Sequence, residues 1–548
     1  QQMPEPSRRI FINTEVCEGC GDCGVQSNCL SIVPVETPFG RKRAIDQSSC
    51  NKDYTCADGF CPSFVSVEGG RPRKGHSAVS DSHRARLDAL LQRLPDPSKS
   101  AQRDCNLLVV GIGGTGVVTI GAIVSMAANL ENRAASVLDV TGLAQKGGAV
   151  ISHVRLSAGD TPTGPVRIDA ADADTAILCD AVAAMKPEAW RTLAQHRSTV
   201  IVNTHLAPPT EFTRDPEARH DAASIRHHLE RAVGAHRLHS IDAHALARQH
   251  YGDTILANMI MLGHAWQRGA VPVSCAAIEQ AIALNGVAVQ ANLAAFHLGR
   301  LSAWRPDALQ DAGMPEPEYD PGHDTIDAVL ERNAAALAAY QNAAYARRYE
   351  ELIVRVRDAE QRVRPAAAPR LALAAARSLY QFMAIKDEYE VARLYTDGTF
   401  RRRLAEQFEG DYTLRFHMAP PLFAPKDART GRPRKVALGP WAETVMKALA
   451  HGRHMRGTWL DIFGMQAERR MERRLLREFE TVLESIVTHL DTKNYETAVA
   501  LAALPQTVRG FGHVKAAAAQ RYTAELARLR PLFMHHDTPH TALQHALP

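Results

Sequence analysis

The chain of 548 residues is too long for a single hydrophobic core, and typical domain sizes predict three or four domains. Its composition, with 45% hydrophobic and 23% charged residues, is that of an ordinary globular protein. A formal net charge of +4 over this length gives no indication of nucleic-acid binding. The longest uncharged run, 105–130, has a glycine-rich centre and scattered polar residues, so we predict no membrane span.

The N-terminus lacks the basic and apolar regions of a signal peptide, so we expect a cytoplasmic protein. Residue 1 is Gln rather than an initiator Met, which processing, renumbering or truncation would each explain.

Residues 1–75 are rich in cysteine and lack a regular hydrophobic periodicity, which predicts a small α+β module held together through its cysteines. A polar linker, 76–103, follows. Residues 104–302 then alternate apolar strand-like runs with Ala-rich helices, which predicts a doubly wound α/β domain. The expected strands are 107–110, 135–140, 149–156, 175–179 and 198–202, with helices at 117–129 and 181–196.

A proline-rich and acidic stretch, 303–325, predicts a second linker. Residues 326–548 show mostly the periodicity of amphipathic helices without a fixed repeat, so we expect a mainly helical C-terminal domain. Within it, the arginine-rich run 469–477 alternates with Glu and Leu. This alternation favours a solvated helix face, with a cationic docking surface for an acidic partner as the alternative.

Seven of the ten cysteines lie in the first module, with spacings typical of iron–sulfur ligation. The first three form a C-x2-C-x2-C triple, in which a thiolate at every third residue can contact three corners of a cubane cluster. The second half repeats the triple with an aspartate at the central position. The candidate ligands are Cys17, Cys20, Cys23 and Cys29 in the first half, and Cys50, Asp53, Cys56 and Cys61 in the second.

In two-cluster ferredoxins the fourth ligand of each cluster comes from the other motif. This rule predicts one cluster on Cys17, Cys20, Cys23 and Cys61, and a second on Cys29, Cys50, Asp53 and Cys56. Because carboxylate is a poorer match for iron–sulfur than thiolate, we expect the second to be a [4Fe–4S] cluster with one oxygen ligand or a [3Fe–4S] cluster.

Zinc and disulfides are the alternative interpretations of these cysteines. Zinc sites favour paired C-x2-C units rather than a triple, and disulfides are rare without secretion. Cys105, Cys179 and Cys275 lie in strand or helix patterns, where buried structural thiols are expected.

A glycine-rich turn follows the first predicted strand of the α/β domain and matches G-x-G-x-x-G before a helix. Backbone N–H groups at such a helix start can hold an anion, and Asp139 lies about where a ribose-binding acid would follow. NAD binding and a structural or CoA-facing turn are both compatible with this pattern. The candidate residues are Gly111, Gly113, Gly114, Thr115 and Gly116.

A second glycine-containing loop, which holds Gln145, Lys146, Gly147 and Gly148, suits an anionic ligand or a plain turn with a solvated lysine. His153, His205 and His264 are expected to be structural, because nothing in the sequence pairs them with a nucleophile.

These motifs resemble those of the bacterial indolepyruvate:ferredoxin oxidoreductases. The similarity is carried by 17–29, 40–53 and 59–64 for the ferredoxin-like domain, by 110–119, 141–148, 202–205 and 285–289 for the γ-type domain, and by 389–394 and 509–515 for the C-terminal helical domain.

The resemblance implies oxidative decarboxylation of 2-oxoacids, particularly arylpyruvates, to acyl-CoA with reduction of ferredoxin. Thiamine diphosphate is the cofactor and CoA the cosubstrate. The chain lacks the G-D-G and N-N motif that holds Mg²⁺ and thiamine diphosphate. We therefore expect these groups in a partner subunit or a fused N-terminal half, within a hetero-oligomer built on a dimer.

This interpretation makes the chain an electron-transfer part that supplies no general base. Two other functions stay open. One is an NAD(P)-linked iron–sulfur oxidoreductase that uses the glycine-rich turn and Asp139, and the other is an electron-transfer adaptor whose helical region is an assembly surface.

Overall fold

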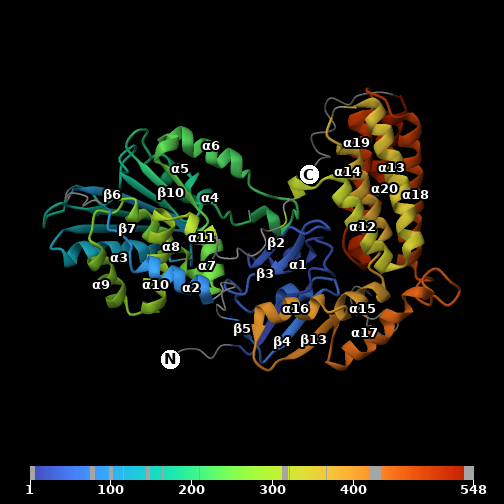
Figure 1. Cartoon of the computed structure of the whole chain (residues 1–548), viewed down its shortest axis with the longest axis horizontal. Coiled ribbons are helices and arrows are strands. Elements are labelled where there is room, and N and C mark those ends of the chain that lie inside the picture. Colours follow the sequence, from blue (N-terminus) through green and yellow to red (C-terminus); the bar gives the residue numbers. More distant parts are fainter. Residues whose placement is uncertain are drawn as a thin grey trace. The chain divides into compact units, whose positions relative to one another are not determined.

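The computed structural model describes residues 6–73, 81–97, 103–114, 116–142, 148–162, 164–208, 210–310, 319, 321–365, 367–419 and 433–535. The chain is a mixed α/β multidomain protein with a helical C-terminal region (Figure 1). It divides into two compact units, one made of 1–72, 210–217 and 318–548, and the other of 73–209 and 218–317. No helix of the described residues is long and apolar enough to span a bilayer.

The second unit is built on a six-stranded sheet with the order β11-β10-β9-β6-β8-β7. Strands β6, β9, β10 and β11 are parallel, whereas β8 is antiparallel to both β6 and β7. The strands are β6 Cys105–Ile112, β7 Ala135–Thr141, β8 Ala149–Leu156, β9 Thr175–Leu178, β10 Thr199–Asn203 and β11 Leu238–Ile241. All five predicted strands are confirmed, but the sheet is mixed because the connection from β7 to β8 is too short for a parallel crossover.

Both faces of the central strands of this sheet are buried, which explains why these strands are continuously apolar. Leu107 and Val109 point into a core formed with helices α3, α8, α9 and α10, whereas Leu108 and Val110 point into a core on the other face with α4 and α6. The helices of this unit are α2 Asp81–Leu91, α3 Val117–Leu130, α4 Ala181–Ala184, α5 Pro187–Trp190, α6 Ala222–Val233, α7 Ala243–Tyr251, α8 Ala257–Gln267, α9 Cys275–Asn285, α10 Val289–Trp304 and α11 Asp307–Gln310.

The helix predicted at 181–196 is wrong, because two short helices, α4 and α5, stand in its place. Pro187 is the first residue of α5, and the preceding Lys186 has extended backbone angles. A residue before proline is disfavoured in the helical region, so the chain breaks at that point.

The first unit joins the two ends of the chain in one antiparallel sheet with the order β1-β4-β13-β14. Two further pairs, β2 with β3 and β5 with β12, form separate two-stranded sheets. The strands of the unit are β1 Arg8–Ile12, β2 Ile32–Val35, β3 Lys42–Ile45, β4 Phe64–Glu68, β5 Arg71–Pro72, β12 Phe408–Glu409, β13 Thr413–Met418 and β14 Val436–Leu438. Phe11 and Val65 share a core with Phe400 and Phe416. The sequence prediction treated these two ends as separate domains.

Helices form the rest of the first unit. Three of them, α15 Glu388–Thr396, α16 Thr399–Gln407 and α17 Trp441–His451, pack beside the shared sheet. The others surround a core of their own (Figure 1). These are α12 Ile326–Tyr340, α13 Ala343–Val363, α14 Arg370–Met383, α18 Ala467–His489, α19 Tyr495–Ala503 and α20 Gly512–His535.

Phe416 is the side chain whose loss should most directly test the shared sheet. It is fully buried, pairs in register with Val65, and its ring lies 5.3 Å from that of Tyr395. We expect Phe416→Ala to lower the free energy of unfolding by roughly 3–5 kcal/mol, because it leaves a cavity in the core. Denaturant titration followed by circular dichroism measures the loss. Trp441→Ala is the control, since that ring is 61% exposed, and an equal loss in both variants would contradict the packing described.

Candidate functional site

The first predicted ligand set comes together around two tight turns after β1. Gly19 and Gly21 flank Cys20 with φ of 69° and 82°, backbone angles that only glycine adopts readily. Burial raises the pKa of Cys20, and the neighbouring Cys61 raises it further. Burial also raises the pKa of Cys23, followed by the charges of Cys17 and Cys61. The four thiols are therefore close enough to interact.

Two hydrogen bonds reach sulfur atoms of this set. The Gly19 N–H donates to the Cys17 Sγ at 3.3 Å, and the Ser63 Oγ lies 2.9 Å from the Cys61 Sγ. Such bonds stabilise a thiolate ligand and tune the potential of an iron–sulfur cluster.

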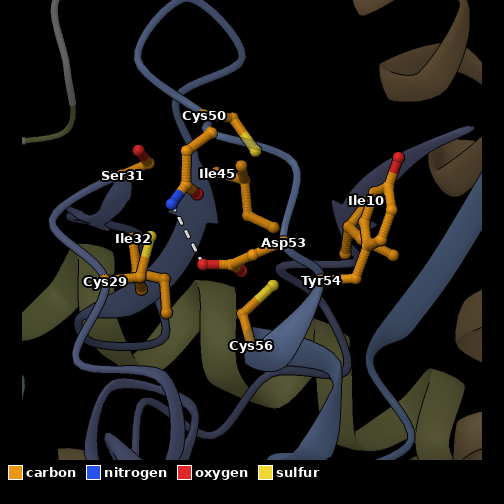
Figure 2. A pocket seen from close by; sticks show the side chains of 10 residues that line it. Ile10, Cys29, Ser31, Ile32, Ile45, Cys50, Asp53, Tyr54 and Cys56 are labelled. Carbon is orange, nitrogen blue, oxygen red and sulfur yellow. Dashed lines mark hydrogen bonds between the residues drawn. The ribbon is translucent and has the colours of Figure 1, made fainter. Parts of the chain in front are cut away.

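The second predicted ligand set lines one small pocket (Figure 2). Cys29, Cys50, Asp53 and Cys56 surround it together with apolar side chains from β1, β2 and β3. Burial raises the pKa of Cys56 to about 12, and the charges of Cys29, Cys50 and Asp53 add to the effect. The structure thus brings together the same four residues that the spacing rule paired.

Asp53 also has a local structural role. Its Oδ1 accepts hydrogen bonds from the Thr55 N–H at 3.1 Å and from the Thr55 Oγ1 at 2.9 Å, and its Oδ2 accepts one from the Asn51 Nδ2 at 3.0 Å. In Figure 2 the carboxylate lies among the Cys29, Cys50 and Cys56 side chains. These contacts fix the carboxylate at the pocket, where it can act either as a cap of the turn or as a metal ligand.

None of the ten cysteines, all of which lie among the described residues, forms a disulfide. Among the described residues, no three His, Cys, Asp or Glu side chains converge as they would around a single metal ion. A cubane cluster places its ligands on separate iron atoms, so its thiolates lie farther apart than those around one ion.

Two lysines from the C-terminal region hold the loops that carry the first set. The Lys386 Nζ donates to the carbonyl oxygens of Glu15 and, at 3.2 Å, of Cys17. The Lys435 Nζ donates to the carbonyl oxygens of Gly59 and, at 3.4 Å, of Cys61. These lysines place positive charge beside the thiols.

The charged surroundings of the first set perturb the lysines in turn. Burial lowers the pKa of both Lys386 and Lys435 below the ordinary lysine value. Nearby acidic groups and cysteines oppose this shift but do not cancel it. Lys42, which is 8% exposed, has a pKa lowered to about 7 by burial and by the charge of Lys386. Sequence reasoning missed these lysines, because Lys386 lies 369 residues from Cys17 along the chain.

The motif at 509–515 lies against the same set. The Gly510 N–H donates to the Glu18 Oε2 at 2.8 Å, and the Lys515 Nζ donates to the Glu18 Oε1 at 3.2 Å. Burial opposes the charge of Lys515, but Glu18 and Glu472 raise its pKa overall. A Cβ added to Gly510 would lie 3.2 Å from the Cys20 Cβ, so the backbone of this motif approaches the thiols closely.

The glycine-rich turn of the second unit has the predicted strand–turn–helix context. The Gly113 N–H donates to the carbonyl oxygen of Gly148 at 2.8 Å, which ties the two glycine loops together. Gly114 and Gly116 have φ of 86° and 89°, and α3 begins after Gly116 without a side-chain cap. Thr115, Gln145, Lys146 and Gly147 lie outside the described residues. Anion binding by these loops therefore stays a prediction.

Asp139 does not lie where a nucleotide-binding acid is needed. It is an exposed residue of the edge strand β7, paired with Ser152 of β8, and β8 separates β7 from β6. In dinucleotide-binding folds the strand with the acid neighbours the strand before the glycine turn. The geometry therefore weighs against the nucleotide alternative.

A polar group that the sequence analysis did not predict lies at the carboxyl ends of β9 and β10, and only its His205 was named there, as a structural residue. The Asn203 Nδ2 lies 2.7 Å from the His244 Nδ1, and the rings of His205 and His244 stack at 4.3 Å. Asp180 caps α4. Burial raises the pKa of the Asp180 carboxyl, whereas hydrogen bonds from the backbone of α4 and the charges of His220 and His205 oppose this shift. The carboxyl edge of a parallel sheet is where such folds bind ligands.

Comparison with known families assigns the two larger regions separately. Residues 106–302 match the family described as pyruvate ferredoxin/flavodoxin oxidoreductase. Residues 326–528 match a family of unknown function, DUF6537.

Two similar proteins carry the name indolepyruvate oxidoreductase subunit IorB. The one from Methanothermobacter thermautotrophicus is 29% identical over 199 residues, which are 35% of this chain and 95% of the relative. The one from Pyrococcus horikoshii is 26% identical over 199 residues, 36% of this chain and 95% of the relative. Among solved structures, this chain is similar to a keto/oxoacid ferredoxin oxidoreductase γ subunit from Geobacter sulfurreducens, with 21% sequence identity and a TM-score of 0.26. The matched region covers 36% of this chain and 98% of that subunit.

Proposed function

We propose that this chain is the electron-transfer and γ-type part of an indolepyruvate (arylpyruvate):ferredoxin oxidoreductase, which converts 2-oxoacids and CoA to acyl-CoA and CO₂. The match of residues 106–302 and the similarity to the IorB subunits support the family of reactions. The observation that carries the electron-transfer role is the assembly of the eight predicted ligands into two separate groups.

The donor sets fit two iron–sulfur clusters. Cys17, Cys20, Cys23 and Cys61 offer four soft thiolates to one cluster, and the second set offers three thiolates and the Asp53 carboxylate. When bound, such clusters accept and pass on electrons one at a time. The protein's own part is to hold the loops, exclude water and supply positive charge through Lys386 and Lys435.

The remaining groups of the reaction belong to partners. Thiamine diphosphate and Mg²⁺ are held by a thiamine-binding subunit or fused N-terminal half, CoA is the cosubstrate, and ferredoxin is the electron acceptor. The assembly is a cytoplasmic hetero-oligomer built on a dimer. The glycine loops at 111–116 and 145–148 contribute to the CoA or substrate side of the active-site cavity that this chain forms with the thiamine-binding partner.

The proposed activity is tested on this chain purified anaerobically together with its thiamine-binding partner. We expect arylpyruvate and CoA to drive reduction of ferredoxin or methyl viologen, with iron and acid-labile sulfide in the preparation. Reduction of NAD⁺ in place of ferredoxin would instead support the nucleotide-linked alternative. A cluster-bearing chain that copurifies with no thiamine protein would support the adaptor alternative.

Ligation by Asp53 has a spectroscopic test. Asp53→Cys replaces the only oxygen donor of the second set by a thiolate, so we expect a changed electron paramagnetic resonance spectrum of the reduced protein. Asp58→Cys, at an exposed position of the same turn, is the matched control and should leave the spectrum unchanged. A spectrum of Asp53→Cys identical to that of the wild type would show that Asp53 is only a cap.

Removal of the Lys435 charge should shift the potential of the first cluster. Reduction adds negative charge, so Lys435→Met should make the midpoint potential more negative, by on the order of tens of millivolts for a charge acting at this range. A redox titration followed by electron paramagnetic resonance measures the shift. Lys447→Met removes a lysine whose side chain is 61% exposed and should leave the potential unchanged. Equal potentials in all three proteins would refute the electrostatic role.

A further inference from the structure

A cavity of about 370 Å³ lies within the helical region, among residues 326–528, which match the family of unknown function. It is bounded by the junction of α12 and α13, the segment before α15, the loop 456–464 and the start of α18. Its volume is that of sites for small molecules. Five arginines line it against two aspartates, Asp387 and Asp461; the arginines are Arg348, Arg456, Arg469, Arg473 and Arg477.

The two aspartates are already engaged by the protein. Both oxygens of Asp387 accept hydrogen bonds from Arg456, at 2.6 and 2.8 Å, and the guanidinium of Arg456 lies 3.7 Å from the ring centre of Tyr340. Asp461 accepts hydrogen bonds from two backbone N–H groups of its own loop, at 3.0 and 2.9 Å. These carboxylates therefore fix the walls of the cavity and leave a positive surplus.

Three of the arginines have acidic partners of their own. Arg456 pairs with Asp387, Arg348 pairs with Glu480 at 2.5 Å, and Arg469 pairs with Glu472 at 2.5 Å. Their orientation is fixed before any ligand arrives, which lowers the entropy cost of binding.

Arg473 and Arg477 differ from the other three. They lie one helical turn apart on α18, and neither is within ion-pair distance of a carboxylate in the part of the chain that the structure describes. Arg473 donates to the carbonyl oxygen of Gly464, and the Arg477 Nε donates to that of Arg473 at 3.3 Å. Their remaining N–H groups are donors that match the geometry of a carboxylate or phosphate.

The cavity also has an apolar side. Tyr345 and Phe463 line it, and the loop that carries Phe463 exposes Trp459 and Ile462 by 86% and 59%. A ligand that used both sides would carry an apolar or aromatic group beside its charge.

We propose that this cavity binds a small organic oxyanion, a carboxylate or phosphate ester with an aromatic or apolar group. Arg473 and Arg477 contact the oxygen atoms, and the wall with Tyr345 and Phe463 contacts the apolar group. The site belongs to the helical region and does not depend on the proposed electron-transfer function.

Isothermal titration of the full chain with three probes tests the ligand class. Phenyl phosphate and phenylacetate carry the two kinds of oxyanion, and benzyl alcohol carries the same ring without charge. We expect saturable binding of at least one anion and none of the alcohol, and the tighter anion identifies the head group. Failure of both anions to bind at millimolar concentration, or equal binding of the alcohol, overturns the proposal.

Paired double variants locate the binding. Arg473→Met with Arg477→Met should weaken binding of the anion by about tenfold or more, because charge-assisted hydrogen bonds are lost. Arg470→Met with Arg474→Met removes the same charge from exposed positions of the same helix that do not line the cavity, and should change affinity little. Equal weakening in both would overturn the site in favour of a general charge effect. Arg477→Met alone, at an exposed position, repeats the test if the double variant does not fold.

Discussion

The pairing of β4 with β13 is the contact on which the cysteine-rich segment depends. It is an antiparallel ladder in which Val65 faces Phe416, and it places an aromatic core from the C-terminal region beneath the strands that flank the thiols. The cysteine-rich segment has only a small core of its own, which includes Ile10, Ile32 and Phe64, and a chain of about seventy residues gains little stability from such a core. The C-terminal region adds a larger core beside it, together with the lysines that hold the loops carrying the thiols.

The two thiol groups lie in different surroundings as a result. The first has Lys386 and Lys435 beside it and a close backbone approach by the segment around Gly510, whereas the second lies in a small pocket with apolar walls and carries one carboxylate. Positive charge favours a reduced cluster, and desolvation without compensating charge disfavours it. Clusters bound in both sites would therefore differ in potential by virtue of the protein alone.

Local pattern in the sequence predicted much of this structure. The cysteine spacing predicted the two groups of side chains that the structure brings together, and apolar runs located the five predicted strands of the larger sheet, because these signals are local in the sequence. Tertiary relationships were not predictable in this way. Pro187 ends the helix that an Ala-rich pattern predicted, and the short connection between β7 and β8 makes the sheet mixed. The sequence around Lys386 and Lys435 does not indicate that these lysines bind the loops of the first thiol group.

The shared sheet also orders events during synthesis. Ser66 of β4 and His417 of β13 are hydrogen-bonded across 351 residues of sequence, so β4 leaves the ribosome long before its neighbour exists. Contacts of such long range form late, and an unpaired strand edge is prone to pair with other chains in the interval. The sheet beside the thiols is completed only after β13 has been made, so the cysteine-rich segment reaches its final structure long after it has been synthesised.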